Sequence, residues 1–304
     1  MNQRTQTKAI LIIAVILCSA LIIGSIWGIY LFDHSVPDSG SDLSTTEQSE
    51  TSSSTDTAST EQTTGSVPPN IEQPKKKIAL TFDDGPSSAY THQILDLLER
   101  YQAKATFFVC GYRLTEGTKD ELQRAISLGC EIGNHSNTHE KYLTAFSEEE
   151  LLDEIRTTNE KVAQLSGVNY NCSVYRPPWG ELDRNVVDVL LANEIRMYPI
   201  LWSVDSLDWS YRSKYSKGEI SREEAVQGTF ETVVKYTSEG AVILMHDIQS
   251  ITPDVVKLIL EKYTAEGYEF VTVSELFDFE TTKDDEAYFN RYKSNTEHGI
   301  VPLG

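Results

Sequence analysis

The sequence has few cysteines and few basic residues for a chain of 304 residues. Its four cysteines are too few for a disulfide scaffold and include no Cys-x-x-Cys pair. We interpret Cys110, Cys130 and Cys172 as small buried hydrophobic residues, with one optional disulfide as the alternative. Lysine and arginine number 26 against 46 acidic residues, a formal net charge of −20. Nucleic-acid binding needs a basic face, so this balance disfavours nucleic acid as a partner.

A long apolar run near the N-terminus predicts a membrane anchor. Residues 9–32 are uncharged and mostly apolar, and as a helix they would be about 36 Å long, enough to cross a hydrocarbon core of about 30 Å. Arg4 and Lys8 precede the run and Asp33 follows it. The positive-inside tendency therefore predicts that residues 1–8 are cytoplasmic and that the remainder is external. A cleaved signal peptide is the alternative, although its apolar core is normally only about 7–15 residues.

The composition changes sharply after this run. Between Ser41 and Ser66 there are 16 serines and threonines, five acidic residues and no basic residue. Such a stretch cannot bury enough apolar surface to offset the entropy of ordering it. We therefore predict a disordered linker over residues 33–75, a globular domain over residues 76–280 and a C-terminal extension over residues 281–304.

The globular region alternates short apolar runs with amphipathic segments. This alternation is typical of a parallel α/β sheet or a (β/α) barrel, in which chemistry occurs at the carboxyl ends of strands. Strands are predicted at 78–82, 105–110, 131–133, 173–176, 197–202, 241–245 and 270–273. Helices are predicted at 92–101, 121–128, 147–165, 183–192, 222–235 and 253–263.

Two clusters that follow predicted strands suggest a metal site. Asp83 and Asp84 come directly after the first strand, where one carboxylate could bind a metal and the other could take a proton from water. His135 and His139 follow the third strand at a spacing that can direct two imidazoles to one metal. The alternatives are an ordinary Asp-Gly-Pro turn and a pair of exposed or hydrogen-bonded histidines.

Three further clusters follow later strands. Arg176 begins Arg-Pro-Pro-Trp-Gly and could orient a carboxylate, or it could be a surface cation in a turn. Asp205 begins Asp-Ser-Leu-Asp-Trp, which also fits a capped loop with Trp209 as a core aromatic or a sugar platform. His246 ends an apolar strand and could be a core residue or a proton donor tuned by a carboxylate.

The order TFDDGP, HSNTH, RPPWG, DSLDW and ILMHD resembles the carbohydrate esterase family 4 polysaccharide deacetylases, also called the NodB homology domain. The resemblance covers about residues 77–276 and extends to membrane-anchored peptidoglycan N-acetylglucosamine deacetylases. It implies a distorted (β/α) barrel of about seven parallel strands and a metal-dependent deacetylase. The implied metal is zinc, with cobalt, nickel or manganese as alternatives.

The resemblance also implies a role for each matched residue. The implied metal ligands are Asp84, His135 and His139. The implied catalytic residues are the base Asp83, the arginine Arg176 that positions it, the acid His246 and its tuning carboxylate Asp205. The implied substrate-binding residues are Trp179, whose backbone N–H would stabilise the oxyanion, and Trp209 and Leu244, which would wall the acetyl pocket.

The sequence departs from the family pattern at two places. Trp179 stands where the family often has tyrosine. The stretch from Ser210 to Ser221 is longer than usual and carries Tyr211, Tyr215 and three basic residues. The second departure leaves the preference for substrate length open.

Chemistry and predicted location together lead to an expected function. No Gly-x-Ser-x-Gly motif occurs, which disfavours a serine esterase. An external domain on a membrane anchor lies beside the cell wall, so we expect hydrolytic removal of acetyl groups from N-acetylglucosamine of peptidoglycan. Chitin oligomers, poly-N-acetylglucosamine, acetylated xylan and a non-catalytic wall-glycan-binding role remain alternatives. No protein partner is predicted.

Overall fold

The computed structural model describes residues 75–181 and 183–279 of the chain. The predicted cytoplasmic segment 1–8, the anchor 9–32, nearly all of the linker 33–75 and the extension 281–304 lie outside these residues. Within the two described ranges, no helix combines the length and the apolar character needed to cross a bilayer.

A sheet of parallel strands forms the centre of the described domain. Seven strands run in the order β5-β4-β3-β2-β1-β7-β6, and β8 pairs with the first residues of β1. In the described part of the chain no ladder joins β5 to β6, so the sheet is a curled half-barrel. The predicted α/β class with about seven parallel strands is confirmed in this open form. The strand bounds are β1 Lys76–Asp83, β2 Ala105–Val109, β3 Glu131–Asn134, β4 Val174–Tyr175, β5 Tyr198–Pro199, β6 Val204–Asp205, β7 Val242–His246 and β8 Tyr268–Phe270.

The central strand β1 fixes where the functional residues lie. Its apolar residues Ile78, Leu80 and Phe82 are fully buried, as expected for a parallel strand covered on both faces. The register between β1 and β7 places Asp83 opposite His246. Because the strands are parallel, all of their carboxyl ends meet at one edge of the sheet.

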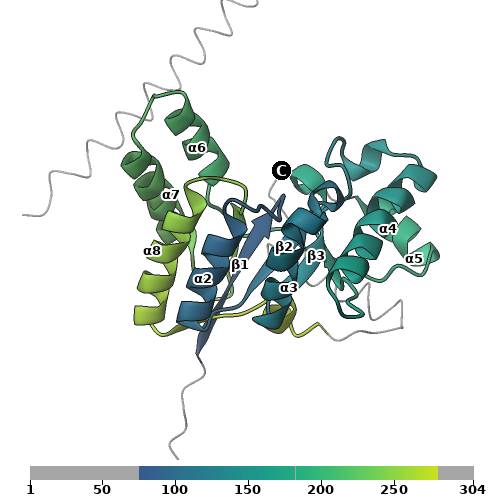
Figure 1. Cartoon of the computed structure of the whole chain (residues 1–304), viewed down its shortest axis with the longest axis horizontal. Helices are drawn as coiled ribbons and strands as arrows, with labels where there is room; N and C mark the ends of the chain where they lie inside the picture. Colours follow the sequence, from purple (N-terminus) through teal and green to yellow (C-terminus); the bar gives the residue numbers. More distant parts are fainter. Residues whose placement is uncertain (1–74, 182, 280–304) are drawn as a thin grey trace, which may run out of the picture. The chain divides into compact units, whose positions relative to one another are not determined.

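The helices lie around the outside of the sheet (Figure 1). Helix α4 begins at a capping box, in which Ser147 and Glu150 satisfy each other's backbone N–H groups. The helix bounds are α2 Thr91–Tyr101, α3 Lys119–Ser127, α4 Glu148–Leu165, α5 Arg184–Ala192, α6 Asp208–Ser216, α7 Arg222–Tyr236, α8 Thr252–Ala265 and α9 Val273–Phe277. The short 3₁₀ turns are η1 Gly111–Arg113, η2 Glu116–Thr118, η3 Leu143–Ala145 and η4 Pro178–Gly180.

Two predicted strands and one loop differ from the structure. The predicted strand 197–202 is reduced to the two residues of β5, and β6 follows it after a four-residue gap. The predicted strand 270–273 ends at Phe270, and Val273 begins α9. Helix α6 begins at the second aspartate of Asp-Ser-Leu-Asp-Trp and continues to Ser216, over a stretch where the sequence shows no apolar periodicity.

Contact with α7 explains why α6 forms without that periodicity. A Cβ atom added to Gly228 of α7 would lie 2.4 Å from the ring of Tyr211, so the ring rests directly on the α7 backbone. The Tyr211 hydroxyl is also 3.4 Å from the hydroxyl of Thr232. Tertiary packing, and not helix propensity, therefore holds α6 in place.

This packing predicts an unusual effect of Gly228→Ala. Alanine normally stabilises a helix interior by about 1 kcal/mol relative to glycine, but overpacking against Tyr211 should cost about 1–3 kcal/mol. We expect lower free energy of unfolding in urea for Gly228→Ala alone, and higher stability when the same change is made in a Tyr211→Ala background. Equal effects in both backgrounds would contradict the packing argument.

Candidate active site

A buried arginine organises the predicted base. Arg176 follows β4 and is fully buried. Its Nε donates to the Ile200 carbonyl at 3.0 Å and its Nη2 to the Leu201 carbonyl at 2.8 Å. Its Nη1 donates to Thr81 Oγ1 at 2.9 Å and to Asp83 Oδ1 at 2.7 Å. The predicted contact between Arg176 and Asp83 is therefore present, with the guanidinium held from three sides.

Opposing effects set the protonation of Asp83. Burial raises the pKa of Asp83 above its usual range, because the interior disfavours a charged carboxylate. The positive charges of Arg176 and His246 act in the opposite direction. The second oxygen, Oδ2, lies 3.6 Å from His135 Nε2, so this carboxylate faces the predicted metal site.

The three predicted metal ligands converge. Asp84 Oδ1 lies 3.5 Å from His135 Nε2 and 3.4 Å from His139 Nε2. One ligand atom from each of these residues lies within 4.8 Å of the other two. One carboxylate oxygen and two imidazole nitrogens form a set that suits a divalent metal with positions left open for water. The donor set therefore fits the metal that the sequence predicts.

The tautomer of His135 supports this assignment. Its Nδ1 lies 2.7 Å from the Arg176 carbonyl, which can only accept a hydrogen bond, so Nδ1 carries the proton and Nε2 is free to bind a metal. Burial lowers the pKa of His135 to about 3. The ring is therefore neutral at ordinary pH, which is the form that binds metals.

The loop between His135 and His139 is held by a residue that the sequence did not reveal. Glu154 of α4 is buried. Its carboxylate accepts hydrogen bonds from the backbone N–H groups of Asn137 and Thr138, each at 2.8 Å, and from the Thr138 hydroxyl at 2.9 Å. The sequence does place Glu154 among the apolar positions that α4 turns toward the core, and a charged residue there could have indicated a buried role.

The predicted pairing of His246 with Asp205 is wrong. His246 Nδ1 lies 2.7 Å from Asp208 Oδ1, and the His246 backbone N–H donates to Asp208 Oδ2 at 2.8 Å. Thr252 donates a further hydrogen bond to Oδ2. Asp205 instead accepts from the Leu207 backbone N–H within the turn that precedes α6. Leu207 adopts a left-handed conformation with φ of 58°, and Asp208 begins α6 immediately after it.

The buried pair of Asp208 and His246 stabilises the protonated imidazole. Burial works against the charge, but the Asp208 carboxylate outweighs it and raises the pKa of His246 to about 10. The pKa of Asp208 is lowered, because attraction to His246 and several hydrogen bonds outweigh the effect of its burial. The pair can therefore hold a proton ready for donation at neutral pH.

Asp247, the alternative partner weighed for His246, lies on the other side of the strand. It is buried and accepts a hydrogen bond from Thr91 Oγ1 at 2.5 Å. A Cβ atom added to Gly85 would lie 2.2 Å from either carboxylate oxygen of Asp247. Asp247 thus packs against the Asp-Gly-Pro turn and explains the glycine there.

Aromatic side chains stand at the rim of the site. Trp179 is 51% exposed, and its ring centroid lies 4.5 Å from that of His139 and 4.9 Å from that of Tyr142. Trp209, at the start of α6, is 49% exposed. Leu244 lies in β7 and is nearly buried. The acetyl pocket formed by Trp209 and Leu244 therefore stays a prediction. Tyr142, which the sequence did not suggest, contacts Trp179 beside the metal ligand His139.

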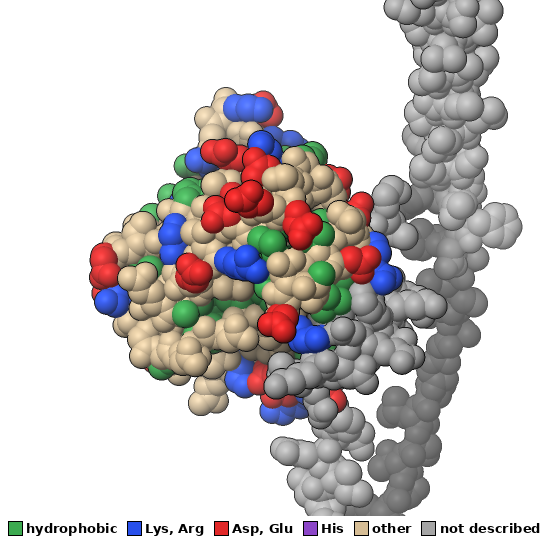
Figure 2. Space-filling view, turned by 90° about the vertical axis from the view of Figure 1, so that its right-hand side faces the viewer, with side chains coloured by type: hydrophobic (Ala, Val, Ile, Leu, Met, Phe, Trp, Pro, Cys, Tyr) green, Lys and Arg blue, Asp and Glu red, His purple; other side chains and the backbone are tan. Residues whose placement is uncertain are grey.

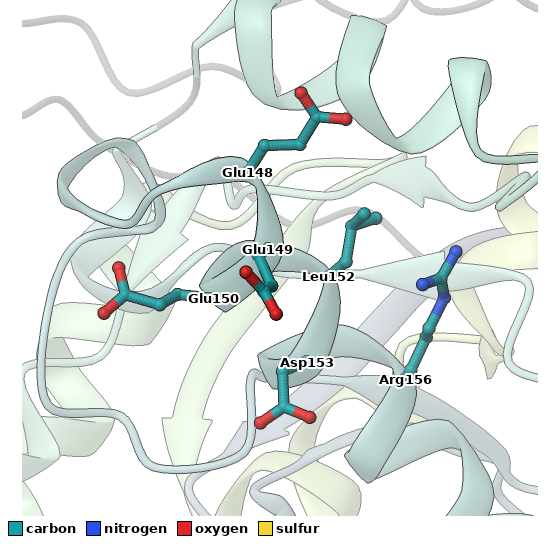
Figure 3. Close-up of a pocket in the computed structure, with 6 residues that line it drawn as sticks. All are labelled: Glu148, Glu149, Glu150, Leu152, Asp153 and Arg156. Carbon is teal, nitrogen blue, oxygen red and sulfur yellow. The ribbon is translucent and has the colours of Figure 1, made fainter.

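Acidic side chains gather on one outer face of the domain (Figure 2). A separate surface depression of about 660 Å³ lies on α4 (Figure 3) and contains none of the predicted site residues. It is lined by Glu148, Glu149, Glu150, Leu152, Asp153 and Arg156. It offers no imidazole and no base held by a buried cation, so the candidate chemistry belongs to the carboxyl edge of the sheet.

The fold and this edge are those expected for a polysaccharide deacetylase, and the chain belongs to the polysaccharide deacetylase family. The family model for polysaccharide deacetylases matches residues 70–198. The chain is 33% identical over 227 residues to a peptidoglycan-N-acetylglucosamine deacetylase of Bacillus cereus, a match that covers 71% of this chain and 95% of that protein.

Two further relatives extend the comparison. The chain is 37% identical over 206 residues to the peptidoglycan-N-acetylmuramic acid deacetylase PdaC of Bacillus subtilis, covering 68% of this chain but only 40% of that protein. The solved structure of PdaC superposes with a TM-score of 0.57 at 34% identity, covering 74% of this chain and 96% of that structure. A family 4 acetyl xylan esterase from Clostridium thermocellum, solved in complex with a cobalt ion, gives a TM-score of 0.57 at 30% identity, with 67% and 91% covered.

The contact between His246 and Asp208 predicts a pH effect that can be measured directly. In metal-free protein, Asp208→Asn should lower the His246 pKa from about 10 by at least about two units, because the opposite charge is lost while burial remains. Histidine NMR titration measures this shift. Asp205→Asn is the matched control, and a larger shift in that variant would restore the rejected pairing.

The same pair contributes to stability with a defined sign. The folded pKa of His246 is raised, so its contribution is fully present below the unfolded value of about 6.5. That contribution is lost as the pH rises through about 10. Urea unfolding of the wild type and Asp208→Asn should therefore differ most below about pH 6.5 and converge as the pH rises past about 10.

Proposed function

We propose that the protein is a metal-dependent deacetylase that hydrolyses the acetamido groups of N-acetylglucosamine in peptidoglycan. The observation that carries this proposal is the juxtaposition at the carboxyl edge of the sheet. Asp83, held by Arg176, stands opposite the protonated His246 across the β1–β7 register, next to the Asp-His-His cluster. A base and an acid on facing sides of one metal site are what amide hydrolysis requires.

Each residue has a separate task in this reaction. Asp83 accepts a proton from the attacking water, and Arg176 orients its carboxylate and favours its ionised form. His246 donates a proton to the nitrogen as the C–N bond breaks, so the products are acetate and a free amine. The Trp179 backbone N–H is the proposed donor to the developing oxyanion. Trp209 and Leu244 are the proposed walls around the acetyl methyl group.

Asp84, His135 and His139 would hold the metal, which we propose to be zinc. When bound, such an ion acidifies water and polarises the acetyl carbonyl. Cobalt, nickel or manganese would suit the same donors, and the structure of the acetyl xylan esterase was solved with cobalt. No serine or cysteine nucleophile is needed for this reaction.

The names of the relatives support a cell-wall substrate. The Bacillus cereus protein is named as acting on N-acetylglucosamine of peptidoglycan and PdaC on N-acetylmuramic acid. Chitin oligomers, poly-N-acetylglucosamine and acetylated xylan are alternative substrates for the same site. A non-catalytic glycan-binding role would leave the buried acid and base without a purpose.

The decisive test is Asp83→Asn. This change should reduce acetate release from wall glycan by roughly 10²–10⁴-fold, because the proton acceptor is lost, while metal content measured by mass spectrometry stays near one ion per chain. His139→Ala should lose both activity and metal. His92→Ala, a change on the exposed surface of α2, should lose neither. Unchanged turnover in Asp83→Asn would remove this residue from the mechanism.

We further propose that residues 9–32 anchor the protein in the membrane with the catalytic domain outside, facing the cell wall. The apolar run and the basic residues Arg4 and Lys8 before it support this orientation. Protease added to wall-stripped cells should release a soluble, active fragment by cutting within residues 41–66. Full-length protein that resists external protease, yet is cut after the cells are lysed, would reverse the orientation.

A further inference from the structure

Helix α6 carries an aromatic residue and a basic residue on one exposed face. Trp209 and Arg212 are three residues apart, so their side chains are neighbours on the helix surface. Both are exposed. Tyr211, on the opposite side, packs on Gly228 of α7 and fixes the rotation of α6 about its axis.

This face begins at the active site. Asp208, the first residue of α6, contacts His246, and its Oδ1 also accepts the Trp209 backbone N–H at 2.8 Å. Arg212 lies one turn further, about 6 Å along the helix axis. Helix α6 stands beyond the carboxyl ends of the strands, on the side toward which β1 points (Figure 1). Along α6, Trp209 and then Arg212 therefore follow the residue that contacts His246.

The charge of Arg212 has no internal use. Among residues 75–181 and 183–279, no carboxylate lies within ion-pair distance of it, although the chain carries 46 acidic residues. Arg124 and Arg222, which are also on helices, are each paired with carboxylates, whereas Arg100 in the last turn of α2 has no ion pair among the described residues and differs from Arg212 in lying away from His246. The other rim of the site, formed by Trp179 and Tyr142, is aromatic. The rim is thus cationic on the α6 side and aromatic on the other.

We propose that Arg212, next to Trp209 on the exposed face of α6, forms a subsite that binds a carboxylate carried by the glycan beside the acetamido group under attack. Guanidinium groups bind carboxylates through paired hydrogen bonds. Peptidoglycan strands supply such carboxylates, either on the lactyl group of muramic acid or on the attached peptide. Chitin and acetylated xylan backbones do not. This inference rests on the proposed deacetylase function and deepens it by naming what selects the polymer.

The test compares Arg212→Ala with the wild type on three substrates, with acetate release as the readout. These are glycan strands freed of peptide by amidase, which expose lactyl carboxylates, strands that retain their peptides, and neutral chitopentaose. In Arg212→Ala we expect the preference in kcat/KM for the carboxylate-bearing strand over chitopentaose to fall about three- to tenfold. A loss confined to peptide-free strands identifies the lactyl group, and a loss confined to peptide-bearing strands identifies the peptide.

Two further variants sharpen the result. Arg212→Lys should restore part of the preference, and added salt should erase much of the difference between wild type and Arg212→Ala. Arg100→Ala removes the same charge from the last turn of α2, at the opposite end of the domain, and should change nothing. An unchanged preference in Arg212→Ala would overturn the proposal.

Measuring how tightly glycan strands bind to a catalytically inactive variant tests the Arg212 subsite independently of the deacetylase activity. In the Asp83→Asn background, tryptophan fluorescence measures the affinity for each strand without turnover. Weaker binding of carboxylate-bearing strands after Arg212→Ala supports the subsite even if the wild type releases no acetate. Equal affinities, with acetate release intact in the wild type, would refute the subsite and leave the deacetylase function standing.

Discussion

The active edge of this protein depends on one buried ion pair. Arg176 is fully buried, and its partner Asp83 is almost so. Breaking a buried pair by removing one partner costs about 3–5 kcal/mol, because an uncompensated charge remains inside. The guanidinium is tolerated only because carbonyls 200 and 201, Thr81 and Asp83 satisfy its N–H groups. The same bonds tie β1, β4 and the chain after β5 into one edge.

Strained backbone accompanies this edge. Asp84, His139, Trp179 and Leu207 all have positive φ, between 54° and 72°, although none is glycine. Each such residue costs on the order of 1–3 kcal/mol and persists only where its surroundings fix it. Asp84, His139 and Trp179 are themselves predicted residues of the site, and Leu207 directly precedes Asp208.

The sequence predicted the parts of the site that follow buried strands. Asp83, Asp84 and His246 end apolar runs, and parallel strands bring their ends together whatever the details of the loops. The contact between Asp208 and His246 was missed because it depends on the left-handed turn at Leu207. That turn decides which of two aspartates, three residues apart, faces β7. Helix α6 was missed for a related reason, because its stability comes from Gly228 of α7, distant in sequence.

The acid and the base support each other's charge. The positive charge of His246 lowers the pKa of Asp83, and the negative charge of Asp83 raises that of His246. Each charge thereby favours the state that its partner needs before reaction, an ionised base and a protonated acid. A divalent cation held by Asp84, His135 and His139 would favour the ionised Asp83 further and disfavour the protonated His246. The metal-bound enzyme should therefore have a His246 pKa below about 10, nearer the pH at which proton donation is efficient. Against that repulsion, the carboxylate in direct contact with the imidazole, Asp208, is the group that most favours the protonated His246, whereas Asp205 is hydrogen-bonded within its own turn.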